Sequence, residues 1–248
     1  MTLAIRFDNV SKCYRLRKQR PFLLRELGRA LLQKPSQVSE HWALRDVSFE
    51  ITRGMSVGVV GGNGAGKSTL LSLIAKTSYP TRGTVTVHGR VGPMLALGAG
   101  FHQDLTGAEN IALNAALLGL TREEVAERYD SIVAYADIGE YLDAPIHQYS
   151  TGMTARLGFA VVAHVDAEIL LLDEVLAVGD APFQEKCLRT IRAFKESGRT
   201  LFFVSHGLAQ VVELCSHMAW IRDGTLVRFG PTDEVAPEFE AAMQAKSG

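Results

Sequence analysis

The chain has 248 residues, a hydrophobic share of 47% and a formal net charge of −1 at pH 7. This length fits a single α/β unit with a sizeable core, and the near-zero charge gives no support to nucleic-acid binding. Three widely spaced cysteines, none in a C-x-x-C pair, indicate a reducing compartment. No signal-peptide-like stretch and no run near the roughly 20 apolar residues of a membrane span occur, so any membrane role must come through a partner.

The first ninety residues carry mainly strand signals. Alternating apolar and polar residues predict strands over 3–10 and 43–51, and the stretch 85–91 predicts a hairpin. The continuous apolar run Met55–Val60 predicts a buried strand, and the run Thr69–Ile74 predicts the first turns of a helix.

A glycine-rich loop joins that strand to that helix and matches the phosphate-binding pattern G-x-x-x-x-G-K-[ST]. Its glycines let backbone N–H groups surround phosphates, and the helix N-terminus adds partial positive charge. Lys67 can reach the outer phosphates, and the Ser68 hydroxyl can ligate Mg²⁺. The predicted nucleotide-binding residues of the loop are Gly61, Asn63, Gly64, Ala65, Gly66, Lys67, Ser68 and Thr69.

Farther along the chain, helical and strand signals alternate. Helices are expected over 109–118 and 122–137; Thr106-Gly107 starts the first, and a Thr121-x-x-Glu124 capping box starts the second. The remaining expected elements are a helix over 153–165, buried strands over 169–172 and 201–204, and a hairpin turning at 222–225. Together these elements predict an α/β fold with a parallel core, a β-rich front edge and a helical insertion at about 96–160.

Polar side chains follow both buried strands. Asp173 and Glu174 end the first, where the carboxyl ends of parallel strands face ligands. We expect Asp173 to hold Mg²⁺ and Glu174 to orient the attacking water; the alternative is a carboxylate pair that caps the next helix. His206 follows the second strand and is placed to hydrogen-bond a γ-phosphate, although a structural role is the alternative.

With these elements assembled, the chain resembles the ATP-binding cassette (ABC) ATPase family along essentially its whole length. The loop 61–69, the strand ending in Glu174 and His206 match family motifs. The resemblance implies a P-loop NTPase (RecA-like) core with an antiparallel β subdomain and an inserted helical subdomain, ATP and Mg²⁺ as cofactors, and a trans role for Asp180. Tyr14 falls where the family stacks an aromatic ring on adenine; a buried core tyrosine is the alternative.

The stretch Tyr149-Ser150-Thr151-Gly152-Met153 looks like the family's LSGGQ signature. In the family this loop binds the γ-phosphate of the nucleotide held by the opposing protomer, which implies that Ser150 and Gly152 act in trans. The chain departs from the family pattern in this signature. It also has Ala96 and Leu97 where the family expects a glutamine, and Gln103 aligns poorly with that position.

With these departures the chain resembles the ATPase subunits of polysaccharide exporters for O-antigen, capsule or teichoic acid. The resemblance rests on the stretches 97–102 and 105–110, the Y-S-x-G-M signature and the insert between Tyr14 and Trp42. The resemblance implies a homodimer peripheral to the cytoplasmic face of the inner membrane, an ABC-2-type permease partner and a lipid-linked polysaccharide cargo. Some members carry a C-terminal carbohydrate-binding domain, so the chain is either a short member or a piece of a longer protein.

The insert is basic and amphipathic over about 15–40, with leucines at helical spacing after Pro21. It suits an anionic membrane surface or a permease groove; an ordinary surface helix is the alternative. The expected domain organisation is one nucleotide-binding domain over 1–248. One rival function is another ABC exporter, for drugs or lipids. A non-transport ABC ATPase would need a long coiled-coil insertion or two cassettes, and residues 149–153 argue against a different phosphate-loop class such as a kinase.

Overall fold

The computed structural model describes residues 2–17, 38–94, 98, 100–173, 179–205 and 207–247. Its centre is a six-stranded sheet with the strand order β5-β6-β7-β3-β8-β9, beside a three-stranded sheet with the order β2-β1-β4. The central strands are β3 (Ser56–Val60), β5 (Val91–Met94), β6 (Ile169–Leu172), β7 (Thr200–Val204), β8 (His217–Arg222) and β9 (Thr225–Pro231). The front strands are β1 (Leu3–Arg17), β2 (Val38–Thr52) and β4 (Arg82–Val87).

Strands β5, β6, β7, β3 and β8 pair in parallel, and only β9 runs antiparallel, at one edge. Every residue of β3, β6 and β7 is buried. These strands are buried on both faces, which explains why their sequences are continuous apolar runs rather than alternating ones. The parallel core predicted from the sequence is therefore confirmed.

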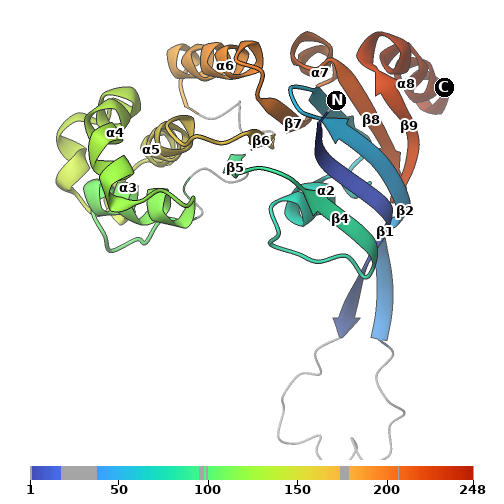
Figure 1. Cartoon of the computed structure of the whole chain (residues 1–248), viewed down its shortest axis with the longest axis horizontal. Helices are drawn as coiled ribbons and strands as arrows, with labels where there is room; N and C mark the ends of the chain where they lie inside the picture. Colours follow the sequence, from blue (N-terminus) through green and yellow to red (C-terminus); the bar gives the residue numbers. More distant parts are fainter. Residues whose placement is uncertain are drawn as a thin grey trace, which may run out of the picture.

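Helices cover both faces of the central sheet (Figure 1). Side chains of α2 (Lys67–Ile74) share one core cluster with the front sheet and with Phe202 and Val204 of β7. Leu201 and Phe203, the alternate residues of β7, belong to the second cluster on the opposite face. The helices on that side are α5 (Thr151–Ala163), α6 (Ala181–Glu196), α7 (Leu208–Leu214) and α8 (Thr232–Ser247).

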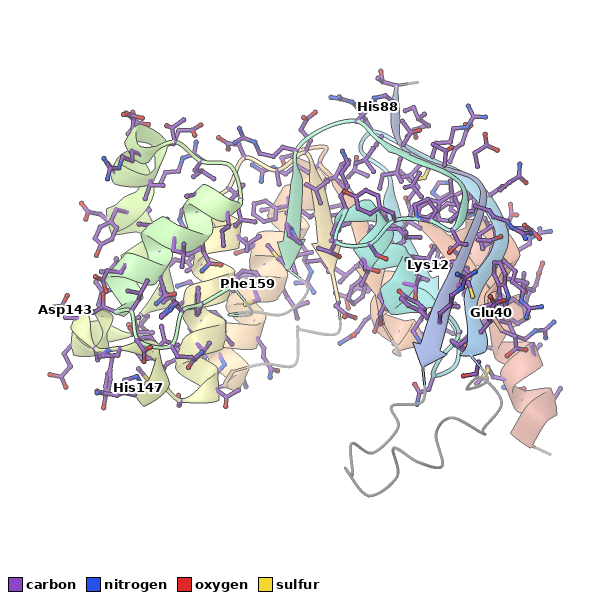
Figure 2. All side chains as sticks on the ribbon, turned by 90° about the horizontal axis from the view of Figure 1, so that it is seen from below. Lys12, Glu40, His88, Asp143, His147 and Phe159 are labelled. Carbon is purple, nitrogen blue, oxygen red and sulfur yellow. The ribbon has the colours of Figure 1, made fainter. Side chains whose placement is uncertain are left out.

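A helical lobe lies at the far end of the molecule from the front sheet. It contains α3 (Gly107–Leu117), α4 (Arg122–Ala136), two 3₁₀ turns (Gly139–Asp143 and Ile146–Gln148) and α5. Figure 2 shows Asp143 and His147 at its outer side, with Lys12 and Glu40 at the other end of the molecule. Both expected helix starts are confirmed, because Thr106 with Glu109 and Thr121 with Glu124 each form a complete capping box.

The predicted hairpin over 85–91 is wrong. Strand β4 pairs with β1, whereas β5 pairs with β6 in the other sheet. The Arg90 N–H donates to the Glu168 carboxylate at 3.2 Å, which fastens the chain to the start of β6 as it crosses between sheets. The β8–β9 hairpin is confirmed, with Asp223 and Gly224 both at positive φ as its tight turn requires.

Strands β1 and β2 extend well beyond the predicted ranges 3–10 and 43–51. Their pairing continues through Tyr14 opposite His41 to Arg17 opposite Val38, which makes two long arms. No helix in the part of the chain that the structure describes is long and apolar enough to cross a membrane.

Candidate nucleotide-binding site

The phosphate loop leads from β3 directly into α2, as the sequence predicted. Gly66, the N-cap of α2, has φ 107°, and a Cβ there would lie 2.5 Å from the Ala43 carbonyl oxygen. Gly64 also has a positive φ, of 73°. A side chain at either position would strain or block the turn. Glycine at both positions therefore lets the loop close tightly around the start of the helix.

Lys67 is buried at the centre of the loop, with 6% of the residue exposed. Its Nζ donates to the carbonyl oxygens of Gly61 at 2.8 Å and Gly62 at 3.0 Å. Burial lowers the pKa of Lys67, and the nearby Asp173 carboxylate opposes this shift. The loop thus holds a cationic side chain in a desolvated position, where an anionic oxygen interacts with it more strongly than in water.

A cavity of about 370 Å³ opens over the phosphate loop. It brings together most of the predicted cis residues, because Tyr14 and Asp173 line it with residues 63–69. Tyr14 is 38% exposed, so it is not a core tyrosine, and the Lys12 Nζ lies over its ring at 5.0 Å from the centre. The other lining residues are His41, Ala43 and Val204.

His41 is a cavity residue that the sequence analysis missed. It lies directly opposite Tyr14 on β2, so the two side chains share a face of the front sheet. The missed signal is the register of β1 against β2, which fixes this pair only when the strands are known to extend beyond residue 10.

The oxygen donors in this cavity fit a magnesium ion. Ser68 offers an exposed hydroxyl at the first turn of α2, and Asp173 offers a half-buried carboxylate just after β6. Hard oxygen ligands of this kind, completed by phosphate and water, are the set that Mg²⁺ prefers. These two residues would hold the cation beside the phosphates.

The signature residues lie at the start of α5, in the helical lobe. Ser150 is the N-cap, and its hydroxyl accepts the Met153 N–H at 3.2 Å. A Cβ at Gly152 would meet no described atom nearer than the Ser150 Oγ, at 3.8 Å. Neither residue, nor Asp180, is among the described residues that line the 370 Å³ cavity. The chain therefore carries two separate sets of predicted nucleotide contacts.

Asp180, the N-cap of α6, is tied to the signature helix. Arg156 Nη2 donates to Asp180 Oδ1 at 2.6 Å, and this hydrogen bond lowers the pKa of Asp180. Arg156 also lies 3.5 Å from Asp137 Oδ2, and its guanidinium stands 5.0 Å from the centre of the Phe183 ring. Arg156 was not predicted from the sequence, since only tertiary packing brings it to Asp180 and Asp137.

Several predicted residues lie outside the described part of the chain. They are Glu174, His206, Ala96, Leu97 and residues 18–37 of the basic insert. Their neighbours hold defined positions: the Ser205 hydroxyl accepts the Gly207 N–H at 3.0 Å. Gln103 lies in the loop before α3, where its carbonyl accepts the His147 N–H at 3.1 Å. The roles assigned to Glu174 and His206 stay predictions.

The class of protein follows from this fold and cavity together with comparisons to known proteins. The ABC transporter family model matches residues 44–177, and the chain belongs to that family. A solved ATP-binding cassette, in a dimeric post-hydrolysis state bound to ADP and Pi, superposes with a TM-score of 0.72. It is 21% identical, and the match covers 92% of this chain and 98% of that one.

Among curated proteins, the chain is 48% identical to an O-antigen export system ATP-binding protein, RfbB, of Klebsiella pneumoniae. That match covers 82% of this chain and 83% of the relative. It is 39% identical to a teichoic acids export ATP-binding protein, TagH, of Bacillus anthracis, over 98% of this chain but only 44% of the relative. The similarity to exporter ATPases thus extends far beyond the motifs.

Proposed function

We propose that this chain is the ATP-hydrolysing subunit of an exporter for a lipid-linked, O-antigen-like polysaccharide. One observation carries the ATP assignment: Tyr14, the phosphate loop and Asp173 line a single cavity. In this proposal residues 1–248 form one nucleotide-binding domain, and the stacking partner of adenine is Tyr14.

The residues of the cavity supply binding and orientation. Lys67 holds the outer phosphates, while Ser68 and Asp173 would hold Mg²⁺, which would supply positive charge beside the phosphates. Glu174 orients the attacking water, and His206 contacts the γ-phosphate. Phosphoryl transfer needs mainly such positioning and charge stabilisation, so no covalent intermediate with the protein is required.

A second copy of the chain completes each site. Ser150 and Gly152 of one protomer, with Asp180, meet the nucleotide held by the other, in a two-fold dimer with two ATP molecules. The described atoms leave room at Gly152, where the nearest neighbour of an added Cβ would be the Ser150 Oγ at 3.8 Å, and this room supports the arrangement. Closure on ATP and opening after hydrolysis would drive the membrane partner.

The cargo assignment is supported by the names of the relatives, which are export proteins for O-antigen and teichoic acids. The partner proposed from it is an ABC-2-type permease, with this chain peripheral on the cytoplasmic face of the inner membrane. Contact with the permease by the basic insert is part of the same proposal.

The test is ATP hydrolysis by the purified chain, measured with and without the permease and with a lipid-linked glycan added. We expect stimulation only when permease and glycan are both present. Hydrolysis that responds to neither would remove the polysaccharide cargo and leave an ABC ATPase for a different substrate. Absence of ATP binding would remove the ATPase proposal itself.

A further inference from the structure

Tyr149, which stands where the family signature has leucine, lies against Gly107 at the start of α3. The Tyr149 hydroxyl donates to the Tyr141 carbonyl oxygen at 2.6 Å. A Cβ on Gly107 would lie 2.1 Å from that hydroxyl oxygen and 3.0 Å from the Leu142 carbonyl oxygen. Any larger residue at 107 therefore collides with Tyr149 as it is placed here.

Backbone hydrogen bonds join the same two segments. The N–H of Ile146 donates to the Leu105 carbonyl at 3.0 Å, and that of His147 donates to the Gln103 carbonyl at 3.1 Å. The Gly107 N–H donates in return to the Ala144 carbonyl at 3.2 Å. The loop 103–107 and the segment 144–147 thus form one unit, and Ser150 follows that unit after two residues.

The loop is in turn fixed to α3 by Asn110, whose side chain is completely buried. Its Oδ1 accepts the His102 N–H at 2.8 Å, and its Nδ2 donates to the carbonyls of Leu105 at 3.0 Å and Thr106 at 2.9 Å. Burial raises the pKa of Tyr149, so its phenol keeps the proton that it donates to Tyr141. The position of the signature loop therefore depends on α3 through several bonded contacts.

Glycine is a poor residue for the first turn of a helix on propensity alone, because alanine costs less conformational entropy. The Gly107–Tyr149 contact supplies a reason for it here. We propose that Gly107 and Tyr149 are a size-matched pair of positioning residues that hold Ser150 and Gly152 in the geometry needed to meet the partner's nucleotide. The inference rests on the proposed trans role of those two signature residues.

The pair is tested with Gly107→Ala, Tyr149→Leu and the double variant. Gly107→Ala should lower kcat by about 10- to 100-fold, as expected for a displacement of about 1 Å at a reacting site. The affinity of the monomer for a fluorescent ATP analogue should stay the same, because the phosphate-loop cavity is untouched. Adding Tyr149→Leu should restore most of the lost kcat, since it removes the 2.1 Å clash with the hydroxyl and leaves only the tight 3.0 Å contact with the Leu142 carbonyl oxygen.

Gly230→Ala is the matched control, because a Cβ there meets its nearest neighbour at an ordinary 3.5 Å. If Gly107→Ala fails to fold, Tyr149→Ala replaces it and should lower kcat with unchanged nucleotide affinity. Wild-type kcat in Gly107→Ala, or no rescue in the double variant, overturns the pair. A wild-type chain that binds ATP but never dimerises would instead contradict the proposed trans site.

Discussion

The phosphate loop (61–69) and the signature loop (149–153) are both glycine-containing turns that open a helix, but their surroundings differ. In the first, a Cβ at Gly66 would lie 2.5 Å from a backbone oxygen, and Lys67 is bonded to two carbonyls. In the second, a Cβ at Gly152 would meet only the Ser150 Oγ among the described atoms, at an ordinary 3.8 Å. Crowding by the chain's own backbone thus explains the glycine at 66 but not the glycine at 152. This difference is the one expected if, as proposed, the phosphate loop serves the chain's own nucleotide and the signature loop serves that of a partner.

The largest effect is expected in the phosphate loop. Lys67→Ala should weaken ATP binding by about 100-fold, because hydrogen bonds from a charged donor contribute about 1.5–3 kcal/mol each. Isothermal titration calorimetry measures this change directly. The exposed Lys76, just beyond the end of α2, provides a control variant that should bind as the wild type does. Equal ATP affinities of the two variants would show that Lys67 does not contribute to nucleotide binding.

A substitution in the signature loop should change the hydrolysis rate and leave the ATP affinity unchanged. Gly152→Asp should keep wild-type ATP affinity but lower the hydrolysis rate by about 100-fold, because a carboxylate would face the partner's phosphates. Gly139→Asp is the control, since that glycine also has open space and its φ of 57° is one that aspartate tolerates. A loss of ATP affinity in Gly152→Asp would mean that the signature loop acts in its own chain's site.

Local sequence signals predicted the helices and strands that hold the phosphate loop and the signature loop. The helix start at Thr106, the capping box at Thr121 and the apolar runs of the buried strands depend on neighbours a few residues away, so the sequence alone was sufficient to predict them. The hairpin predicted over 85–91 failed because the partner of β5 is β6, whose residues lie far along the chain. Arg156 and His41 were missed for the same physical reason, since helix packing and strand register bring them to their sites.

A smaller effect is expected where the signature helix joins α6. Arg156→Ala removes the bond to Asp180 and the ring contact with Phe183, and should lower Tm by about 2–4 °C. Arg156→Lys should recover only part of this loss, because lysine lacks the two-pronged guanidinium. The control is Arg189→Ala, which breaks an exposed i,i+4 pair with Glu185 and should leave Tm nearly unchanged. Equal Tm values for the alanine variants would show that Arg156 does not brace the helix.

The smallest effect is expected from two buried cysteines, through the pH dependence of the free energy of unfolding. Burial raises the pKa of Cys187 and of Cys215 to about 12. Below about pH 7.5 both thiols are protonated in the folded and unfolded states, so they add no pH dependence there. Above that pH the unfolded chain loses these protons first, so the free energy of unfolding should fall as the pH rises toward 12. Urea titrations from pH 8 to 10.5 measure how steeply the free energy of unfolding falls with pH. This fall should be less steep in Cys187→Ala.

In the proposed dimer each ATP site combines the phosphate loop of one chain with the signature loop of the other. We would measure ATP hydrolysis by an equal mixture of Lys67→Ala and Gly152→Asp chains, at an ATP concentration where each variant alone should have little activity. Half of the dimers should then be mixed, each with one intact site of two, so activity should return to about a quarter of the wild-type value. Activity no greater than the sum of the separate variants would contradict a site shared between chains.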